Sequence, residues 1–150
     1  MYTFKKDVQT AAGSIQLCAG QEAGCEAAIH GISKLFQADE TDALLLVDAD
    51  NAFNRLNRKV ALWNIQYTCP PLSTILINCY RTPSRLFVSG GMELSSEEGT
   101  TQGDPLAMAM YALAVIPLIQ QLHGITQHVW YADNAQAAGK LHSNTGIPPT

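Results

Sequence analysis

Apolar residues recur along this chain with different spacings, and each spacing predicts a kind of element. Residues 25–36 carry apolar side chains at helical spacing, and the polar run 37–42 that follows predicts a turn. Residues 43–47 form a short continuous apolar run, which is typical of a fully buried strand. Residues 52–66 predict a second helix. The apolar positions of this segment include Phe53, Leu56, Val60, Trp63 and Tyr67.

Prolines and glycines mark the element boundaries in the middle of the chain. The Pro70-Pro71 pair opens a helix that runs to about residue 79, because proline is well tolerated in the first turn of a helix. Strands over residues 85–89 and 92–95 flank Gly90-Gly91, which is a standard two-residue hairpin signal.

The last part of the chain predicts a buried helix and a second hairpin. Asp104-Pro105 starts a helix to about residue 122 that is apolar on nearly all sides and is therefore expected inside the fold. Residues 128–130 and 135–139 then flank a tight turn with an acidic tip. This order of elements predicts an α+β fold, an antiparallel sheet with helices packed on one face. Four aromatic residues are expected in the core: Trp63, Tyr67, Tyr80 and Tyr111.

Composition and charge limit the classes of function. The chain has 150 residues, 47% hydrophobic and 15% charged, which is enough apolar material for one core and argues against disorder. Its net charge is −4, so a strongly basic surface that binds nucleic acid tightly is not expected. The basic residues that do group are Arg55, Arg58 and Lys59, and again Arg81 and Arg85. They are either the flanks of a template groove or ordinary solvated charges.

The four cysteines, at positions 18, 25, 69 and 79, show no Cys-x2-Cys spacing and no adjacent histidine pattern. A zinc site is therefore not supported, and the thiols are expected to be buried in a protein of a reducing compartment. The start of the chain lacks the apolar core of a secretory signal, and the longest apolar stretch, residues 106–116, is too short to span a bilayer. We therefore expect an intracellular protein, nuclear or cytoplasmic, with no membrane partner.

Two aspartates follow apolar strands at distant points in the sequence. Asp48 ends the run 43–47, and Asp133 stands at the tip of the second hairpin. Magnesium prefers oxygen ligands, and proteins usually hold it with one or two carboxylates together with substrate phosphates. The pair therefore predicts a divalent-metal site, although each aspartate taken alone is more often a turn or helix-capping residue. Asp50 is expected to be such a turn or capping residue.

Three short motifs surround these aspartates. Asp48 and Phe53 form an Asp-x4-Phe block, residues 102–106 read Gln-Gly-Asp-Pro-Leu, and residues 131–134 read Tyr-Ala-Asp-Asn. In this order they resemble two palm motifs and the Tyr-x-Asp-Asp motif of the reverse transcriptases, with the last aspartate changed. The Gln-Gly-Asp-Pro-Leu block is closer to the non-LTR (LINE-like) retrotransposon branch than to the retroviral or group II intron branches. Residues 20–29 are similar, more weakly, to the family's finger region. The resemblance covers about Asp7 to Gly139.

The resemblance implies an incomplete fingers and palm domain. Residues 1–41 and 65–98 would be fingers-like, residues 42–64 and 99–140 palm-like, and residues 141–150 a loop-like tail. A reverse transcriptase also needs a thumb after the Tyr-x-Asp-Asp hairpin, and only 16 residues follow Asn134. The chain is therefore expected to be a fragment that binds nucleic acid weakly.

The resemblance also implies a metal-binding role for the residues at the strand ends. Asp48 and Asp133 would bind Mg²⁺, or Mn²⁺ in its place, with the Ala49 carbonyl as a further oxygen. Asn134 would supply an amide oxygen where the family has a carboxylate. This change removes one full negative charge from the catalytic group.

Nucleotide and primer contacts are implied in the same way. Phe53 would exclude a 2′-hydroxyl from the incoming nucleotide, or else be a core residue. Gln102 and Gly103 would contact the nucleotide and template, at the start of a helix where an anion is favoured or where Asp104 simply caps the helix. Tyr131 would support the primer end. Arg55 and Arg58 would flank the primer and template.

Three functions remain open from the sequence. The first is a reverse transcriptase domain that, in the complete protein, uses an RNA template, a DNA primer and deoxynucleoside triphosphates in two-metal nucleotidyl transfer. The second is a catalytically inactive remnant or an interaction module with the palm fold, which Asn134 and the missing thumb favour. The third, an RNA-dependent RNA polymerase, is disfavoured by Phe53 and by the Gln-Gly-Asp-Pro-Leu block. The sequence indicates no oligomeric state.

Overall fold

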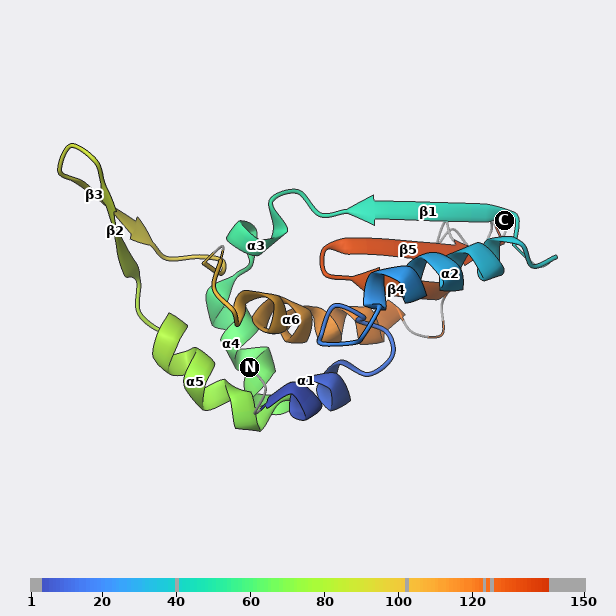
Figure 1. Cartoon of the computed structure of the whole chain (residues 1–150), viewed down its shortest axis with the longest axis horizontal. Helices are drawn as coiled ribbons and strands as arrows, with labels where there is room; N and C mark the ends of the chain where they lie inside the picture. Colours follow the sequence, from blue (N-terminus) through green and yellow to red (C-terminus); the bar gives the residue numbers. More distant parts are fainter. Residues whose placement is uncertain (1–3, 40, 102, 123, 125, 141–150) are drawn as a thin grey trace, which may run out of the picture.

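The computed structural model describes residues 4–39, 41–101, 103–122, 124 and 126–140, and it has an α+β fold with antiparallel sheets, as predicted (Figure 1). The predicted tail, residues 141–150, lies outside the described residues. In chain order the elements are helices α1 (Lys5–Ala12) and α2 (Gly24–Phe36), strand β1 (Ala43–Asp48), helices α3 (Ala52–Arg55), α4 (Arg58–Thr68) and α5 (Pro70–Tyr80), strands β2 (Ser84–Val88) and β3 (Met92–Ser96), helix α6 (Ala107–Leu122), and strands β4 (Gln127–Tyr131) and β5 (Asn134–Gly139).

The larger sheet has the order β1–β5–β4, and both strand pairs are antiparallel. β1 and β5 pair along their whole length, from Ala43 opposite Gly139 to Asp48 opposite Asn134. A two-residue turn joins β4 to β5. Residues 15–17 extend the sheet beyond β4, because the Trp130 N–H donates to the Ile15 carbonyl (3.0 Å) and the Leu17 N–H donates to the Trp130 carbonyl (2.8 Å).

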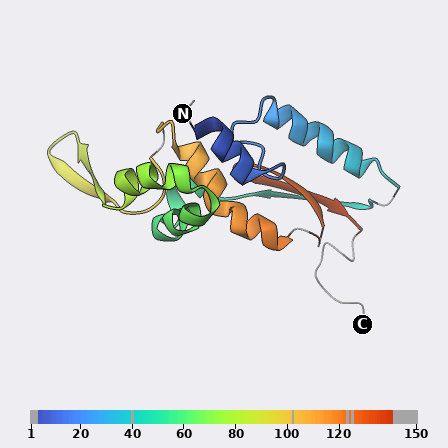
Figure 2. The same ribbon diagram turned by 90° about the horizontal axis from the view of Figure 1, so that it is seen from below.

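The main core surrounds α6, which is buried over most of its length, as its apolar composition predicts. Helices α1, α4 and α5 contribute most of the other buried side chains of this core, and α2 packs against β4 and β5 (Figure 2). Tyr80 and Tyr111 are buried, as predicted. The separate hairpin of β2 and β3 extends away from the helices, and its turn at Gly90-Gly91 is also as predicted (Figure 1).

The predicted helix over residues 52–66 is two helices, because the chain is extended at Leu56 and the helix restarts at Asn57. The Asn57 side chain accepts a hydrogen bond from the Val60 N–H (3.1 Å) and so caps α4. The face of α4 turned to the core consists of Arg58, Ala61, Leu62 and Ile65. Trp63 and Tyr67 were predicted to be core residues, which is wrong, since they are 59% and 69% exposed.

The prediction that residues 43–47 form a strand is confirmed, but the prediction that this strand is buried is wrong. β1 lies at the edge of the sheet and pairs with β5 on one side only within the described part of the chain. Its side chains from Leu44 to Val47 are exposed, with Leu46 the most exposed at 65%. An apolar run alone does not show whether a helix covers the faces of the strand, and α2 packs against β4 and β5.

Three smaller expectations also change. Helix α1 carries the buried residues Val8 and Ala12 and was not predicted, and α6 begins at Ala107, three residues later than expected. Of the four free cysteines only Cys69 is buried, while Cys18 is half-buried and Cys25 and Cys79 are exposed, so the expectation of four buried thiols is wrong. Among the described residues, no helix is long and apolar enough to cross a membrane.

Candidate active site

The two aspartates predicted to bind a metal lie at neighbouring strand ends. Asp48 is the last residue of β1 and is paired with Asn134, the first residue of β5, while Asp133 occupies the turn directly before Asn134. The Ala49 N–H donates to the Asp133 carbonyl at 3.3 Å, which ties the exit of β1 to this turn. The pairing of β1 with β5 therefore brings together residues that are far apart in the sequence.

Two further predicted residues, Asn134 and Tyr131, lie beside Asp48 in the sheet because of the cross-strand register. Asp48 is opposite Asn134, and Asn134 is opposite Tyr131, and residues that are directly opposite in an antiparallel sheet project to the same face. Asp48 and Asn134 are exposed, and Tyr131 is half-buried. The amide of Asn134 therefore neighbours the carboxylate of Asp48 at the surface of the molecule.

Magnesium binding by these residues stays a prediction. Among the described residues, no group of three or more His, Cys, Asp or Glu side chains is arranged to hold a metal. Asp48 and Asp133 instead offer two carboxylates on adjacent strand ends, with the Asn134 amide oxygen beside them. Mg²⁺ is usually held in this way, by one or two carboxylates with water and substrate phosphates completing the octahedron.

The turn that carries Asp133 is held by a residue that the sequence did not indicate. Ala132 is buried and has φ 53°, in the left-handed region that non-glycine residues rarely adopt. The Gln16 side chain accepts a hydrogen bond from the Ala132 N–H (2.9 Å) and donates one to the Ala132 carbonyl (3.1 Å). In the sequence, Gln16 is marked only as a polar residue between the apolar Ile15 and Leu17, and this pattern does not identify Ala132 as its hydrogen-bond partner.

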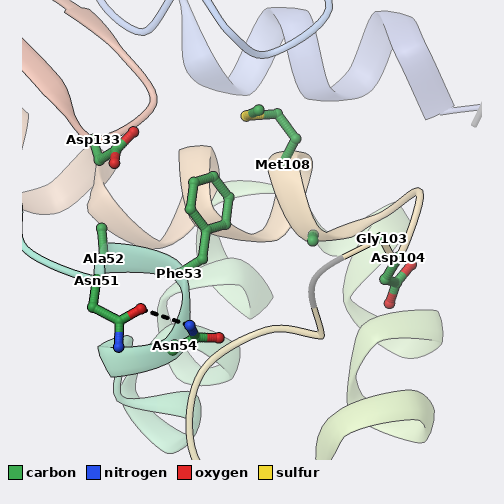
Figure 3. Close-up of a pocket in the computed structure, with 9 residues that line it drawn as sticks. Asn51, Ala52, Phe53, Asn54, Gly103, Asp104, Met108 and Asp133 are labelled. Atoms are coloured by element: carbon green, nitrogen blue, oxygen red, sulfur yellow. Dashed lines mark hydrogen bonds between the residues drawn. The ribbon is translucent and has the colours of Figure 1, made fainter.

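A pocket of about 380 Å³ lies beside Asp133. It is lined by residues of the α3 segment, by Gly103 and the beginning of α6, and by Asp133 itself (Figure 3). Phe53 and Gly103, both predicted to contact a nucleotide, therefore share one pocket with a predicted metal ligand. Gln102 lies outside the described residues.

Phe53 has features of both roles that the sequence left open for it. Its ring stacks on the buried Tyr111, with ring centroids 4.6 Å apart, so it contributes to packing. The same ring lines the pocket and points into the space between Asp133 and Met108 (Figure 3). Because the half-buried ring of Phe53 packs on a second aromatic ring, it is well suited to limit the size of a molecule that enters the pocket.

The segment that follows β3 fixes the position of α3 and hence of Phe53. The Thr100 N–H donates to the Phe53 carbonyl (2.8 Å), and the Gly99 N–H donates to the Leu56 carbonyl (2.8 Å). A Cβ added to Gly99 would stand 2.4 Å from the Asn54 carbonyl oxygen, and its φ of 68° is also unfavourable for other residues. Glycine is therefore required for this close approach.

Arg58 supports the same segment and is not positioned to contact a template. It is only 5% exposed, and its guanidinium donates to the backbone carbonyls of Ser96 (2.8 Å), Glu98 (2.7 Å) and Gly99 (3.0 Å). It also lies over the ring of Tyr80, 5.3 Å from the centroid. The prediction that Arg58 flanks the primer and template is therefore wrong. Arg55 is exposed and pairs with Asp50 (3.1 Å), which lies in a turn as predicted.

Asp104 caps the chain that enters α6. Its carboxylate accepts from the Leu106 N–H (2.8 Å) and also accepts a hydrogen bond from the Tyr80 hydroxyl. Burial, and secondly this hydrogen bond, raise the pKa of Tyr80, so the hydroxyl stays protonated and donates. Capping by Asp104, one of the two predictions for this region, is therefore found, while the anion site stays a prediction, because Gln102 lies outside the described residues.

Two weak acids, Cys18 and Tyr111, lie close enough to Asp133 to be influenced by its charge. Burial raises the pKa of the Cys18 thiol to about 11 and also raises the pKa of Tyr111, with the charge of Asp133 a smaller cause for both. Cys18 is therefore a thiol and not a thiolate near neutral pH.

Compared with known protein families and with curated protein sequences, the chain matches none.

Proposed function

We propose that this chain is part of a reverse transcriptase domain of the non-LTR retrotransposon type, with its nucleotide-binding centre at the ends of β1 and β5. The observation that supports this best is the grouping of the motif residues. Asp48 and Asp133 meet at adjacent strand ends, and the pocket beside Asp133 is lined by Phe53 and Gly103. Three motifs that are separate in the sequence thus contribute to one site.

In this proposal Asp48 and Asp133 hold Mg²⁺, and Asn134 contributes a neutral oxygen beside them. A bound divalent ion supplies positive charge for the triphosphate of a nucleotide. Phe53, whose ring stacks on Tyr111, would exclude a 2′-hydroxyl from the sugar, and Tyr131, which is paired with Asn134, would support a primer end. The chain's own contribution is positioning, which is the main task of a protein in phosphoryl transfer.

An inactive remnant or an interaction module is the second candidate. It is favoured by the amide at Asn134, which lowers the negative charge beside Asp48, and by exposed apolar side chains. These include Leu46 on β1, 65% exposed, and Phe87 on the projecting hairpin, 75% exposed. Such residues are normal singly at a protein surface, but neighbouring ones are common where another protein binds.

Binding of a fluorescent deoxynucleoside triphosphate, followed by anisotropy with and without Mg²⁺, tests the proposal. We expect binding that requires Mg²⁺ and that Asp133→Asn, a change of one charge at nearly constant shape, weakens at least about tenfold. Asp39→Asn removes an equal charge from an exposed turn after α2 and is the matched control. Binding that persists without metal, or that both variants weaken equally, contradicts the proposal.

Competition by ribonucleotides in the same assay tests the role of Phe53. We expect Phe53→Ala to let a ribonucleoside triphosphate compete better against the deoxynucleotide, because the ring no longer fills the space beside the sugar. Phe87→Ala, on the exposed hairpin, should leave the preference unchanged. A variant that stays folded by circular dichroism but keeps the deoxynucleotide preference would show that Phe53 is a packing residue only.

A further inference from the structure

Gln16 and Ala132 form a contact between two distant parts of the chain. The Gln16 side chain is completely buried, and both of its polar atoms bond to the backbone of Ala132, 116 residues away in the sequence. The chain on either side of Gln16 is itself anchored, because Ile15 and Leu17 both hydrogen-bond to Trp130 in β4. The amide therefore projects from a fixed backbone and reaches the turn at a fixed position.

Ala132 needs such a partner for two reasons. Its left-handed backbone, φ 53°, is strained in a residue with a Cβ and persists only where the surroundings hold it. It is also only 3% exposed, and a buried backbone N–H and carbonyl must both find hydrogen-bond partners. Gln16 supplies one acceptor and one donor, which matches these two needs.

We propose that Gln16 is a positioning residue for the candidate metal centre, because its amide fixes the left-handed conformation of Ala132 and thereby the direction in which Asp133 leaves the turn. This inference rests on the proposed function. Asp133 follows Ala132 directly, so a change in the backbone angles of Ala132 moves the Asp133 carboxylate relative to Asp48. Gln16 itself does not line the pocket, so it acts through Ala132 and not as a ligand.

The chain offers a matched control for a merely structural glutamine. Gln9 is half-buried, lies on the neighbouring helix α1, and donates from its side chain to the Gly20 carbonyl at 2.6 Å. It links two backbone segments, as Gln16 does, but makes no hydrogen bond to the β4–β5 hairpin. Gln9→Met removes one hydrogen bond between a glutamine side chain and the backbone. Gln16→Met removes two bonds of this kind at the β4–β5 turn.

Calorimetric titration of Mn²⁺ into the whole chain gives the first readout. We expect Gln16→Met to weaken Mn²⁺ binding roughly 10- to 100-fold, the usual effect of removing a group that orients a metal ligand, and Gln9→Met to leave it unchanged. Adding Ala132→Gly to Gln16→Met should restore most of the affinity, because glycine adopts a positive φ without support. Equal losses in both methionine variants, or no recovery with glycine, would overturn the inference.

Amide hydrogen exchange and the NMR resonances of Asp133, both measured without metal, give a second readout that does not need the proposed function. We expect Gln16→Met to lose protection at the Ala132 amide and to shift Asp133, and Gln9→Met to do neither. If the wild type binds no Mn²⁺ but these changes occur, the proposed function fails and the positioning of the turn stands. If Ala132 remains protected in Gln16→Met, the positioning role fails.

Gln16→Glu, which keeps the acceptor and loses the donor, replaces the methionine variant if the latter does not fold.

Discussion

Asn134 sets the charge of the candidate centre, because its amide lies across the strand pair from Asp48. An amide oxygen can ligate a metal, but it does not attract the ion from a distance or offset its charge. The affinity of a hard cation rises with the number of anionic oxygens around it. The centre as it stands therefore has two charges, from Asp48 and Asp133, and should bind Mg²⁺ weakly.

We predict that Asn134→Asp tightens Mg²⁺ binding by roughly 1 to 2 kcal/mol, about 5- to 30-fold, because a third carboxylate joins the site at its solvent-exposed side. Asp48→Ala in the same protein should remove this gain. Asn78→Asp, which adds an equal charge on the exposed side of α5, controls for a general electrostatic effect. Calorimetry of the four proteins measures this. Equal affinities throughout would mean that Asn134 is a hairpin residue with no role toward a metal.

Asp48 and Asp133 could be singled out from the sequence because Asp48 ends a strand and Asp133 lies in a hairpin turn, and both features are visible in local patterns. Gln16 and Arg58 could not be assigned in the same way. Their partners are backbone atoms of distant residues, and a backbone carbonyl or N–H leaves no trace in the amino-acid sequence. A side chain that supports a motif from a distant part of the chain, as Gln16 and Arg58 do, is therefore harder to predict from the sequence than the motif itself.

At the scale of elements, periodicity and turn residues predicted most of the helices and both hairpins, but not α1 and not the environments of the elements. The predicted helix 52–66 divides at Asn57 because this residue caps a new helix, and the division turns Arg58 inward and Trp63 outward. The division thus decides which residues of α4 reach the core. β1 was placed correctly, and its exposure depends on which strands a helix covers, since α2 packs against β4 and β5, and no local pattern in β1 contains this information.

One interaction network connects four elements around the pocket. Arg58 at the beginning of α4 holds the chain after β3, and its guanidinium lies over Tyr80 at the end of α5. Tyr80 in turn donates to Asp104, which caps the chain entering α6. Because Gly99 and Thr100 in the held segment bond to α3, this network also determines where Phe53 lies.

We predict that Arg58→Met lowers the free energy of unfolding by about 3 kcal/mol, because three backbone carbonyls lose a charged donor at once. Arg55→Met should change it by less than about 0.5 kcal/mol, since Arg55 is exposed and its single ion pair is at the surface. Urea unfolding followed by circular dichroism measures both. Similar small effects in the two variants would mean that the Arg58 network does not stabilise the fold.

At the scale of the whole molecule, charge limits what the chain can bind. The net charge is −4, and with Arg58 buried the cationic groups at the surface are fewer than the sequence suggests. Two of the exposed arginines are paired with acidic side chains, Arg55 with Asp50 and Arg85 with Glu93. A phosphate backbone therefore meets little uncompensated positive charge.

We predict that the chain binds an RNA–DNA primer-template with a Kd of roughly 10⁻⁴ to 10⁻⁶ M or weaker at physiological salt, the usual non-specific range. Binding should weaken further as salt rises, because any attraction that remains is electrostatic. Fluorescence anisotropy over a series of salt concentrations measures both the affinity and its dependence. Nanomolar affinity at physiological salt would require a basic surface that the described residues do not form.

The contact between Gln16 and Ala132 affects how the domain should be delimited and how it folds. A segment cut to begin just before β1 would keep Asp48, Phe53, Gly103 and Asp133, and so would contain the three motifs, yet it would lack the amide that holds the turn. Contacts between residues so far apart form late in folding, because the entropy of closing a long loop must be overcome first. The candidate metal centre should therefore form late in folding, as should the packing of α1 on α6, which joins similarly distant parts of the chain.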